Sequence, residues 1–388
     1  MLKQKKIPAV FMRGGTSKAL MFHRNDLPDN ETEWDAIFQA AIGSPDPNNR
    51  QLDGMGGGIS SLSKVCVISR SARDDADIDY TFAQIAVSQD NVGYGANCGN
   101  MSSAVGPFAV DEGLVKPAGN EALIRIYNTN TNKIIHSRFA MDGDKAAVDG
   151  DFQIKGVSGT GAPVYLDFFD PGGAVTGSLL PTGNVTDVIE VDGIGMVEVS
   201  LVDSANPCVF VEASVLGITG TEGPVEIDSM LDVMAKLESI RAHGAVLMGL
   251  VKSINDATQL SPALPFVGMV SVAQDAQTLT GDTILADKGD LTARIISSGN
   301  THRALPLTGA ICCASAAHID NSIVHRQTRR TALEGKEKEN DLRIMQPSGV
   351  LPAACKVVNA DTGWVVERAS VYRTQRRLFE GRVLIRSF

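Results

Sequence analysis

Two segments of this 388-residue chain follow the same plan and lie about 210 residues apart, one in each half. In each, a turn of glycine and small residues leads directly into an apolar helix with a cysteine in its first turn; the segments are 95–101 and 307–313. A plan that recurs once in each half favours two duplicated halves over a short-period repeat. The length also suits two domains of similar size, and we expect their boundary between about 180 and 198, after a turn rich in proline and glycine.

The hydrophobic pattern predicts more strands than helices. Short apolar runs rich in Val, Ile and Phe are typical of strands, and they lie at residues 9–12, 64–69, 80–87, 123–127, 197–202, 208–213, 266–272 and 383–385. Helical periodicity is clearest at residues 31–42 and 227–242. The helix that begins near Cys98 should kink at Pro107 and end at Gly113.

Charge and composition exclude several classes of partner. The chain carries 35 basic and 45 acidic residues, and a net charge of -10 repels polyanions, so we expect no nucleic-acid partner. It has no run of eighteen apolar residues and no signal-peptide core, which predicts a cytoplasmic protein with no membrane partner. In that compartment the six scattered cysteines are expected to be reduced thiols.

Motifs for common cofactors and metals are missing. The glycine-rich loops at 13–18 and 54–58 have neither the phosphate-loop order of glycine, lysine and serine or threonine nor a Rossmann fingerprint. The sequence has no Cys-x-x-Cys, no helix motif with paired histidines and no Gly-x-Ser-x-Gly elbow. We therefore expect no metal and no cofactor.

The remaining candidates for chemistry are glycine turns at helix starts, together with cysteine and lysine side chains. Main-chain amides at a helix N-terminus bind carboxylates, and their field favours the thiolate of a nearby cysteine. Cys98 is the best-placed thiol because polar Asn97 and Asn100 flank it; the alternative is a small buried core residue. Lys64 opens a strand after the polar turn 60–63, where its ammonium could lean over a cleft or simply end a solvated strand.

Many of the same residues carry a resemblance to a known family. The motifs are Met-Arg-Gly-Gly-Thr-Ser-Lys at 12–18, Asn-Cys-Gly-Asn-Met at 97–101, and further matches at 43–46, 50–57, 63–65, 104–109, 205–207, 241, 248–250, 302–304 and 308–310. With them the chain resembles the PrpF family over nearly its whole length. Members include 2-methylaconitate cis-trans isomerase, 4-oxalomesaconate tautomerase and methylitaconate isomerase. The chain departs from the family at Ala19, where glycine is frequent, and at Gln346, where histidine is usual.

The resemblance implies an α+β fold like that of diaminopimelate epimerase. Such a fold has two similar domains, each a mixed β-sheet wrapped around a central helix, with the active site in the cleft between the domains. It implies an N-terminal domain of residues 1–190, joined by the C-terminal strand 375–388, and a C-terminal domain of residues 191–374.

The resemblance also implies Lys64 and Cys98 as the catalytic residues. Epimerases of this fold use two cysteines that face the substrate, and Cys98 takes the first position. The second half has Thr308, Gly309 and Ala310 where the second cysteine would stand, so Lys64 is expected to be the other proton-transfer group. To act as a base at neutral pH, Lys64 must be partly unprotonated.

The expected substrate-binding residues share either an exposed amide or a group that can bind a carboxylate. Amides at Cys98, Gly99, Gly309 and Ala310 would hold carboxylates, cationic side chains would form ion pairs, Asn206 would donate a hydrogen bond, and Asp53 would orient Lys64 or cap its loop. The full set is Arg13, Gly14, Gly15, Thr16, Ser17, Lys18, Asp53, Gly54, Asn97, Gly99, Asn100, Met101, Asn206, His302, Arg303, Thr308, Gly309 and Ala310.

The implied function is a cofactor-independent isomerase of an unsaturated tricarboxylate. The enzyme would remove an allylic proton, spread the charge into a dienolate and return a proton, with 2-methylaconitate of the 2-methylcitrate cycle in propionate catabolism as the first choice. The alternatives are a 4-oxalomesaconate tautomerase in aromatic catabolism and a non-catalytic tricarboxylate-binding protein. The missing second cysteine argues against a two-thiol amino-acid epimerase. Whether the chain forms a homo-oligomer stays open.

Overall fold

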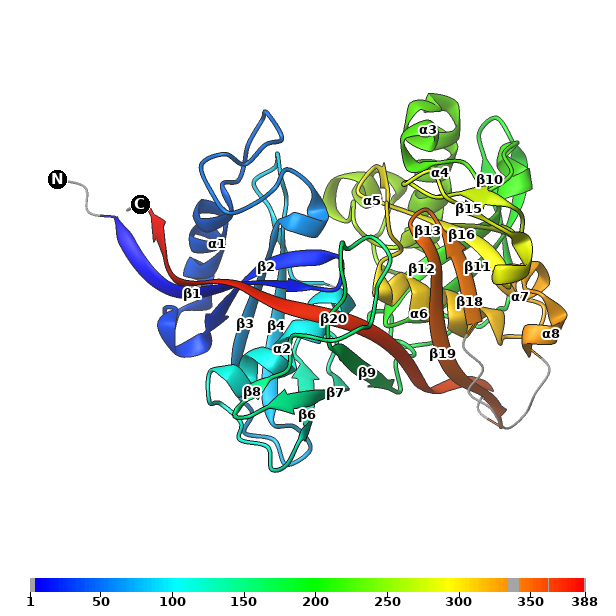
Figure 1. Ribbon diagram of the computed structural model, residues 1–388. Helices are drawn as coiled ribbons and strands as arrows, with labels where there is room; N and C mark the ends of the chain where they lie inside the picture. The colour runs from blue at the N-terminus through cyan, green and yellow to red at the C-terminus, as the bar shows by residue number, and fades with distance from the viewer. Residues whose placement is uncertain (1–3, 96, 334–341, 362, 387–388) are drawn as a thin grey trace. The chain divides into compact units, whose positions relative to one another are not determined.

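The chain divides into two compact units in the computed structural model, which describes residues 4–95, 97–333, 342–361 and 363–386. The first unit holds residues 1–166 and 372–388, and the second holds residues 167–371. The chain passes between them within strand β9 (Pro163–Phe169) and again within strand β20 (Gly363–Ile385) (Figure 1).

The first of these crossings lies before the expected boundary at 190/191. The segment after β9 belongs to the second unit because Asp203 of that unit binds it. The main-chain oxygen of Asp203 accepts from the amide of Gly173, and its Oδ2 accepts from the amides of Val175 and Thr176. The second crossing, at 371/372, lies close to the expected start of the returning strand at 375.

The first unit is a mixed sheet with helices on both of its faces. Its elements are β1 (Lys5–Gly14), β2 (Ser17–His23), α1 (Trp34–Ile42), β3 (Lys64–Arg70), β4 (Ile78–Ile85), β5 (Val92–Gly93), α2 (Gly99–Asp111), β6 (Glu121–Asn128), β7 (Lys133–Asp142), β8 (Lys145–Ala146), β9 and the end of β20, with short 3-10 turns η1 (Arg24–Asp26), η2 (Glu31–Glu33) and η3 (Ser60–Leu62). Along the ladder β1-β2-β3-β4-β6-β7 the pairings alternate, starting antiparallel and then parallel. β20 pairs antiparallel with β1.

The second unit repeats this ladder. Its elements are β10 (Asp187–Val191), β11 (Gly195–Ser204), β12 (Asn206–Glu212), η4 (Ala213–Leu216), α3 (Pro224–Ser229), α4 (Leu231–Leu247), α5 (Ile254–Leu260), β13 (Phe266–Val272), β14 (Ala276–Gln277), β15 (Thr283–Ile284), η5 (Ala286–Lys288), β16 (Leu291–Ser297), β17 (Asn300–Thr301), α6 (Leu307–Ala317), α7 (Ile323–Gln327), α8 (Arg330–Leu333), β18 (Leu342–Gln346) and β19 (Gly349–Ala360). The ladder β11-β12-β13-β16-β18-β19 has the same alternation of antiparallel and parallel pairs. The recurrence of segments 95–101 and 307–313 therefore corresponds to a repeat of the whole topology.

The side chains of β2 and β3 alternate between the two faces of the first sheet, and a buried core lies on each face. Leu20, Phe22, Val65 and Val67 pack in one apolar cluster with the buried face of α1. The intervening side chains are also buried and lie on the opposite face, where α2 contacts β1, β2, β3, β6 and β7. Because side chains alternate between the faces of a strand, a sheet covered on both sides needs such continuous apolar runs.

Helix α2 is buried over residues 99–110, so small residues are needed all around it. A Cβ on Gly106 would lie 2.6 Å from Ser137 Oγ, which shows how closely β7 approaches the helix. The helix contains Pro107 and continues to Asp111, and Gly113 follows with φ +70°, so the predicted end at Gly113 is confirmed to within two residues.

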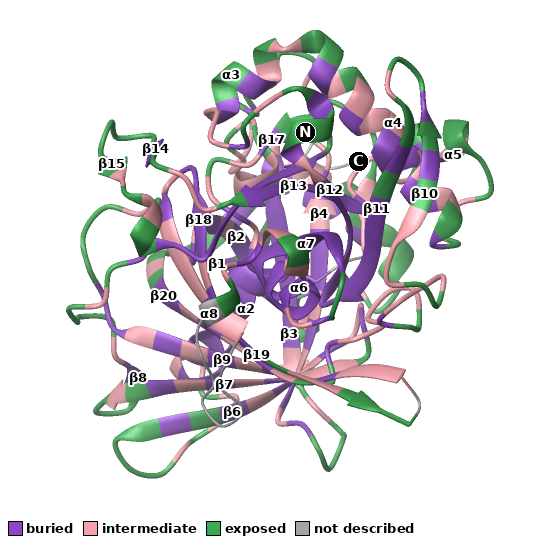
Figure 2. Cartoon of the chain, turned by 90° about the vertical axis from the view of Figure 1, so that its right-hand side faces the viewer, coloured by how far each residue is buried: buried purple, intermediate pink, exposed green. Residues whose placement is uncertain are grey.

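Helix α6 is the counterpart of α2 and is buried over its whole length (Figure 2). On the other face of the second sheet, Leu237 and Ile240 of α4 pack with apolar side chains of β11, β12 and β13. The single helix predicted at 227–242 is wrong, because Met230 leaves helical geometry between α3 and α4. The apolar side chains keep their helical spacing across this break, because Ile227 of α3 and Leu237 of α4 pack in the same apolar cluster. Within the described residues, none of the helices has both the length and the apolar character to cross a membrane.

Candidate active site

Lys64 is the first residue of β3 and is only 8% exposed. Its Nζ donates a hydrogen bond of 2.5 Å to Oε1 of Gln84, the residue opposite it on β4, and lies 5.0 Å from the centre of the Phe82 ring. Gln84 in turn donates from Nε2 to the main-chain oxygens of Ser60, at 3.0 Å, and Ser63, at 2.9 Å. These two carbonyls fix the amide so that its oxygen faces Lys64. Gln84 was not among the predicted site residues.

The loop before Lys64 is held by the buried side chain of Gln51. Its Oε1 accepts from Ser63 Oγ at 2.7 Å and from the amide of Gly58 at 2.8 Å, while its Nε2 donates to Ser44 Oγ at 2.8 Å. Gln51 itself has a left-handed backbone, with φ +53°. One amide side chain thus joins both ends of the loop to the residue that precedes Lys64.

Asp46 organises the same loop from its exposed side. Its carboxylate accepts from the amides of Asn48 at 2.9 Å, Arg50 at 3.0 Å and Gln51 at 2.6 Å. These main-chain donors, that of Asn48 first, hold the pKa of Asp46 below its usual value, because they stabilise the carboxylate form.

Cys98 is the N-cap residue of α2 and is 8% exposed, and its main-chain oxygen accepts from the amide of Ser102 at 3.0 Å. Burial raises the pKa of the neighbouring Cys66 thiol, which also interacts electrostatically with Cys98 and Lys64. Lys64 and Cys66 are two residues apart on one strand, so both face α2. The structure therefore brings the amine of Lys64 and the thiol of Cys98 to the same side of the first sheet.

The β1–β2 turn packs directly on the first turn of α2. A Cβ on Gly14 would lie 2.6 Å from the main-chain oxygen of Asn100, and one on Gly15 would lie 2.4 Å from its Oδ1. Asn100 also donates from Nδ2 to Thr16 Oγ1 at 3.1 Å. Only glycine allows this approach, and Gly15 additionally has φ +51°. The two predicted motifs at 12–18 and 97–101 therefore form one structural group.

The cations of this turn have roles in the fold itself. Arg13 donates from Nη1 to the main-chain oxygens of Gly15 and Thr374 and to Thr374 Oγ1, each at 3.0 Å. Burial, and secondarily the nearby Arg376, lowers the pKa of Arg13. Lys18 Nζ lies 5.4 Å from the centre of the Phe11 ring. Ser17, also predicted, is buried opposite Gly14 in the ladder.

Asn97 and Met101 support the start of α2 from inside. Asn97 is 5% exposed, and its Oδ1 accepts from Ser102 Oγ and from Asn128 Nδ2, both at 3.4 Å. Asn128 Oδ1 accepts from the amide of Thr131 at 2.9 Å. Met101 is fully buried. A connected polar network therefore lies beneath the residues that flank Cys98.

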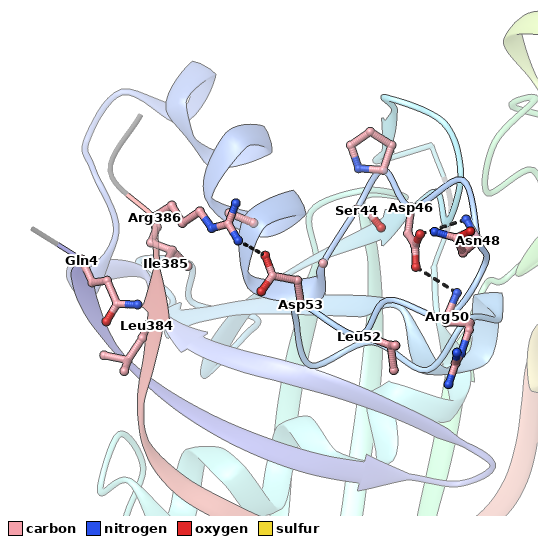
Figure 3. Close-up of a pocket in the computed structure, with 13 residues that line it drawn as sticks. Gln4, Ser44, Asp46, Asn48, Arg50, Leu52, Asp53, Leu384, Ile385 and Arg386 are labelled. Atoms are coloured by element: carbon pink, nitrogen blue, oxygen red, sulfur yellow. Dashed lines mark hydrogen bonds and ion pairs between the residues drawn. The ribbon is translucent and has the colours of Figure 1, made fainter. Parts of the chain in front are cut away.

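Asp53 and Gly54 lie at a different place from Lys64. Asp53 forms an exposed ion pair with Arg386 at 2.8 Å, at the edge of a pocket of about 650 Å³ (Figure 3). The pocket is lined by the loop after α1 together with Gln4 and the end of β20, and neither Lys64 nor Cys98 lines it. A Cβ on Gly54 would lie 2.2 Å from Ile42 C at the end of α1, so this glycine permits close packing. The expected contact between Asp53 and Lys64 is thus replaced by the pair with Arg386.

In the second unit, Asn206 lies at the start of β12 and donates from Nδ2 to Oγ1 of Thr308 in the first turn of α6, at 3.0 Å. Both side chains are buried. Gly309 permits close packing, because a Cβ there would lie 2.4 Å from Ile295 Cδ1. Ala310 is buried within α6, and its amide donates to the main-chain oxygen of Pro306 at 2.9 Å, so the carboxylate donor predicted at Ala310 is wrong. The turn between β11 and β12 therefore meets α6 as the turn between β1 and β2 meets α2.

His302 and Arg303 lie just before α6. The Nε2 atom of His302 is 2.7 Å from Ser297 Oγ, and its ring centre is 6.1 Å from that of Phe266. Arg303 is exposed, and its main-chain oxygen accepts from Ser348 Oγ at 2.6 Å. The Gln346 side chain accepts from the amide of Leu305 at 3.2 Å. The turn at 346–349, where the chain departs from the family pattern, therefore contacts the segment that leads into α6.

The cysteines of α6 are core residues. Cys312 and Cys313 are fully buried, and Cys312 Sγ lies 3.2 Å from the main-chain oxygen of Val202. Burial raises the pKa of Cys313. In the described part of the chain, no three histidine, cysteine, aspartate or glutamate side chains are grouped in a way that would hold a metal ion.

Taken unit by unit, the first carries an amine, a thiol and the N-terminus of α2, and the second carries amide, hydroxyl and imidazole groups near the N-terminus of α6. An amine and a thiol on one side of a sheet can take and return a proton. Free main-chain amides in the first turn of a helix can bind a carboxylate. The groups present thus suit proton transfer on a carboxylate-bearing molecule.

Comparison with curated proteins gives relatives over the full length. The sequence is 41% identical to 3-methylitaconate isomerase of Eubacterium barkeri over 99% of this chain and 98% of that one. It is 37% identical to 2-methyl-aconitate isomerase of Cupriavidus necator over 98% of both chains. It is 35% identical to (4E)-oxalomesaconate Delta-isomerase of Novosphingobium sp. (strain KA1) over 97% of both.

Solved structures also match the chain over nearly its full length. A crystal structure of methylitaconate-delta-isomerase matches with a TM-score of 0.80 and 40% identity, covering 99% of this chain and 96% of that one. A hydroxyproline epimerase from Agrobacterium vitis matches with a TM-score of 0.56 and 10% identity, covering 100% of this chain and 95% of that one, which shows a shared fold. The expected mixture of sheet and helix in an epimerase-like fold is confirmed. The PrpF protein family matches residues 4–386, and the chain therefore belongs to the PrpF family.

Proposed function

We propose that the protein is a cofactor-independent isomerase that transfers a proton on an unsaturated tricarboxylate, with 2-methylaconitate of propionate catabolism as the first substrate. The observation that carries the proposal is the placement of Lys64. Its amine is mostly buried, is oriented by an uncharged acceptor, Gln84, and faces the same side of the sheet as Cys98. Relatives named as isomerases of this kind over nearly the full length support it.

In the proposed mechanism, the unprotonated amine of Lys64 removes an allylic proton and becomes an ammonium. The electron pair left on carbon spreads into the neighbouring double bond and carboxylate as a dienolate. Main-chain amides at Gly99 and Asn100 stabilise the charge that develops on the carboxylate oxygens. A proton then returns to carbon from Lys64 or from the thiol of Cys98, either after bond rotation or at the other allylic carbon.

The remaining carboxylates need further partners, and the predicted residues of the second unit supply them in this proposal. Asn206, Thr308 and His302 present hydrogen-bonding groups near the start of α6. Whether the two units share one site in a cleft, as the resemblance implies, stays a prediction. The cytoplasmic location also stays a prediction, and the oligomeric state stays open.

A second candidate substrate is 3-methylitaconate, an unsaturated dicarboxylate. The observation that favours it is the 41% identity to a relative named for that substrate, above the 37% to the 2-methyl-aconitate isomerase. The reaction would use the same base, since it also moves an allylic proton. A 4-oxalomesaconate tautomerase is the third, with a named relative at 35% identity. A non-catalytic binding protein would hold these molecules without exchanging any proton.

The test is proton NMR in deuterated buffer, which follows isomer ratio and deuterium entry together. Purified protein is incubated separately with trans-2-methylaconitate, 3-methylitaconate and 4-oxalomesaconate, alongside the variants Lys64→Ala and Cys98→Ser. Lys5→Ala is the matched control, because Lys5 is exposed at the start of β1.

We expect conversion of one compound by the wild type and by Lys5→Ala, with loss of both conversion and exchange in Lys64→Ala. Conversion that survives in Lys64→Ala would move the base to another residue. Binding without turnover or exchange on any of the three compounds would favour the non-catalytic alternative and refute the isomerase.

A further inference from the structure

Arg373 is a buried cation on β20 that has no carboxylate partner among the described residues. The residue is 3% exposed, its Nε donates to Oδ1 of Asn100 at 2.9 Å, and its Nη1 donates to the main-chain oxygen of Tyr372 at 2.8 Å. Within the part of the chain that the structure describes, Nη2 makes no hydrogen bond to protein. Burial lowers the pKa of Arg373 to about 10, so the guanidinium remains charged at neutral pH.

Two other buried arginines show how this protein satisfies a guanidinium that has only a structural role. Arg294 donates from all three nitrogens to main-chain carbonyl oxygens. Arg241 pairs with Glu238 at 2.7 Å and donates to three further carbonyls. A buried charge is costly unless it is paired and fully hydrogen-bonded. Among the buried arginines that the structure describes, Arg373 is the one with a nitrogen, Nη2, that has no protein acceptor.

The surroundings of Arg373 indicate the chemistry of the missing partner of its guanidinium. Asn100, which accepts from Arg373, lies in the first turn of α2 and donates to Thr16, and a Cβ on Gly15 would lie 2.9 Å from Arg373 Cδ. The first amides of a helix have no acceptor within it, and the helix dipole makes this end positive. The positive end of the 13-residue helix α2 and the guanidinium of Arg373 therefore lie next to each other. Nothing in the sequence pattern indicated this, because the contact joins residues 273 positions apart.

We infer that Arg373 binds a carboxylate of the substrate at the N-terminus of α2, with Nη2 as the donor. The inference rests on the proposed function, since it requires a carboxylate-bearing substrate. The carboxylate supplies the missing counter-ion and accepts a charge-assisted hydrogen bond, which is stronger than one between neutral groups. Asn100 is then a positioning residue, because it holds Nε and leaves Nη2 available. If Arg373 served only the fold, its sole task would be to hold Asn100.

The experiment measures binding rather than turnover. The probe is tricarballylate, a saturated tricarboxylate that has no double bond to isomerise. Its affinity is measured by calorimetry for the wild type, Arg373→Met, Arg373→Lys and, as a matched control, Arg294→Lys. Thermal unfolding is recorded for each protein with and without the probe.

For Arg373→Met we expect binding at least about tenfold weaker, with an unfolding temperature in the absence of probe that is equal to or above that of the wild type. The second effect follows because the variant removes an uncompensated buried charge. Arg373→Lys keeps the charge and should bind with intermediate affinity. Arg294→Lys should show the opposite pattern, with a lower unfolding temperature and unchanged affinity, because Arg294 has structural partners alone.

Wild-type affinity in Arg373→Met would overturn the inference, as would a wild type that does not bind tricarballylate. If Arg373→Met does not fold, Arg373→Gln carries the same expectation and the same two refuting outcomes. The proposed function is judged separately by wild-type turnover in the NMR assay. A wild type that binds the probe through Arg373 but converts none of the three substrates would refute the isomerase and support the carboxylate site.

Discussion

Gln84 gives the buried amine of Lys64 an acceptor that carries no charge. A carboxylate in its place would favour the ammonium form, whereas an amide oxygen orients the nitrogen with a weaker preference for that form. The two carbonyls that hold Gln84 Nε2 fix which end of the amide faces Lys64. For the proposed base, which must lose its proton before each cycle, an uncharged acceptor that two carbonyls hold in place orients the amine without trapping the charged form.

Two substitutions of Gln84 should separate its effect on the orientation of the Lys64 amine from the effect of a charge beside that amine. Gln84→Met removes the acceptor, and we expect kcat to fall by about tenfold to a hundredfold with little change in KM, because the base is misplaced while the carboxylate contacts remain. Gln84→Glu adds a negative charge beside Lys64, so the pH profile of the rate should move to more alkaline pH. Steady-state kinetics from pH 6 to pH 10 check both, with Gln89→Met as an exposed control. An unshifted profile in Gln84→Glu would count against Lys64 as the base.

Gly15 combines a close approach to α2 with a left-handed backbone. An added Cβ would overlap Asn100 Oδ1 at 2.4 Å, and the backbone is left-handed with φ +51°. We expect Gly15→Ala to lower the free energy of unfolding by about 2–4 kcal/mol, since strain and overlap add. Gly113→Ala is the matched control, with φ +70° and open space around it, and should cost only about 1 kcal/mol. Urea unfolding measures both, and equal losses would show that the overlap is relieved at no cost.

Among the elements, the loop between α1 and β3 connects the exposed carboxylate of Asp46 to the strand that begins with Lys64. Asp46 binds three amides, Gln51 joins the loop to Ser63, and Lys64 follows directly. Two side chains therefore hold this mostly irregular segment, together with main-chain hydrogen bonds from Met55 and Gly56 to the last turn of α1.

This dependence predicts a pH effect with a defined sign. The folded-state pKa of Asp46 is held below its ordinary value of 3.8, first by the amide of Asn48. The ionised side chain therefore stabilises the fold above that value, and the contribution is lost as pH falls through the lowered pKa. We expect Asp46→Asn to reduce the urea midpoint at pH 7 and to have a smaller effect at pH 3. Asp29→Asn should have almost no effect at either pH, because this side chain is fully exposed and its ion pair with Arg24 is 4.0 Å long. A loss that is the same at both pH values would contradict the assignment.

The elements that sequence pattern predicts well are those with a local signal. The strands expected at 64–69 and 266–272 are observed as β3 and β13, because their apolar runs are buried on both faces. Lys64 and Cys98 could be named because each adjoins a turn or a helix start. Gln84 and Arg373 could not, since the first depends on the register of β3 with β4 and the second on the return of β20. Periodicity also failed to show the break at Met230, because both helices bury the same face.

At the scale of the whole molecule, the chain consists of two units with the same topology. The repeat could be predicted from the sequence, and the two units carry different side chains at matching positions. Each unit repeats one ladder of strands with a buried helix whose first turn meets a hairpin. In the first unit that turn begins at a cysteine, and in the second it contains Thr308 bonded to Asn206. A duplicated scaffold therefore carries unlike chemistry in its two halves, which suits one base and one set of binding groups better than two equivalent thiols.

The same division predicts how the chain behaves when it is cut. Residues 167–371 form one continuous unit with its own buried helix and apolar cluster, so a fragment of these residues should unfold cooperatively by circular dichroism. Residues 1–166 lack the end of β20, which pairs with β1 along its length and binds Arg13 through Thr374. That fragment should therefore fail to fold alone.

Joining residue 166 to residue 372 by a short glycine-serine linker should restore folding to the first unit, because the rings of Tyr165 and Tyr372 lie only 5.3 Å apart. The comparison isolates the returning strand, since the linked and unlinked fragments differ in little else. Cooperative unfolding of 1–166 by itself would show that β1 and the turn at 13–16 hold their place on α2 without β20. In that case the anchoring of Arg13 by Thr374 would be dispensable for the fold of the first unit.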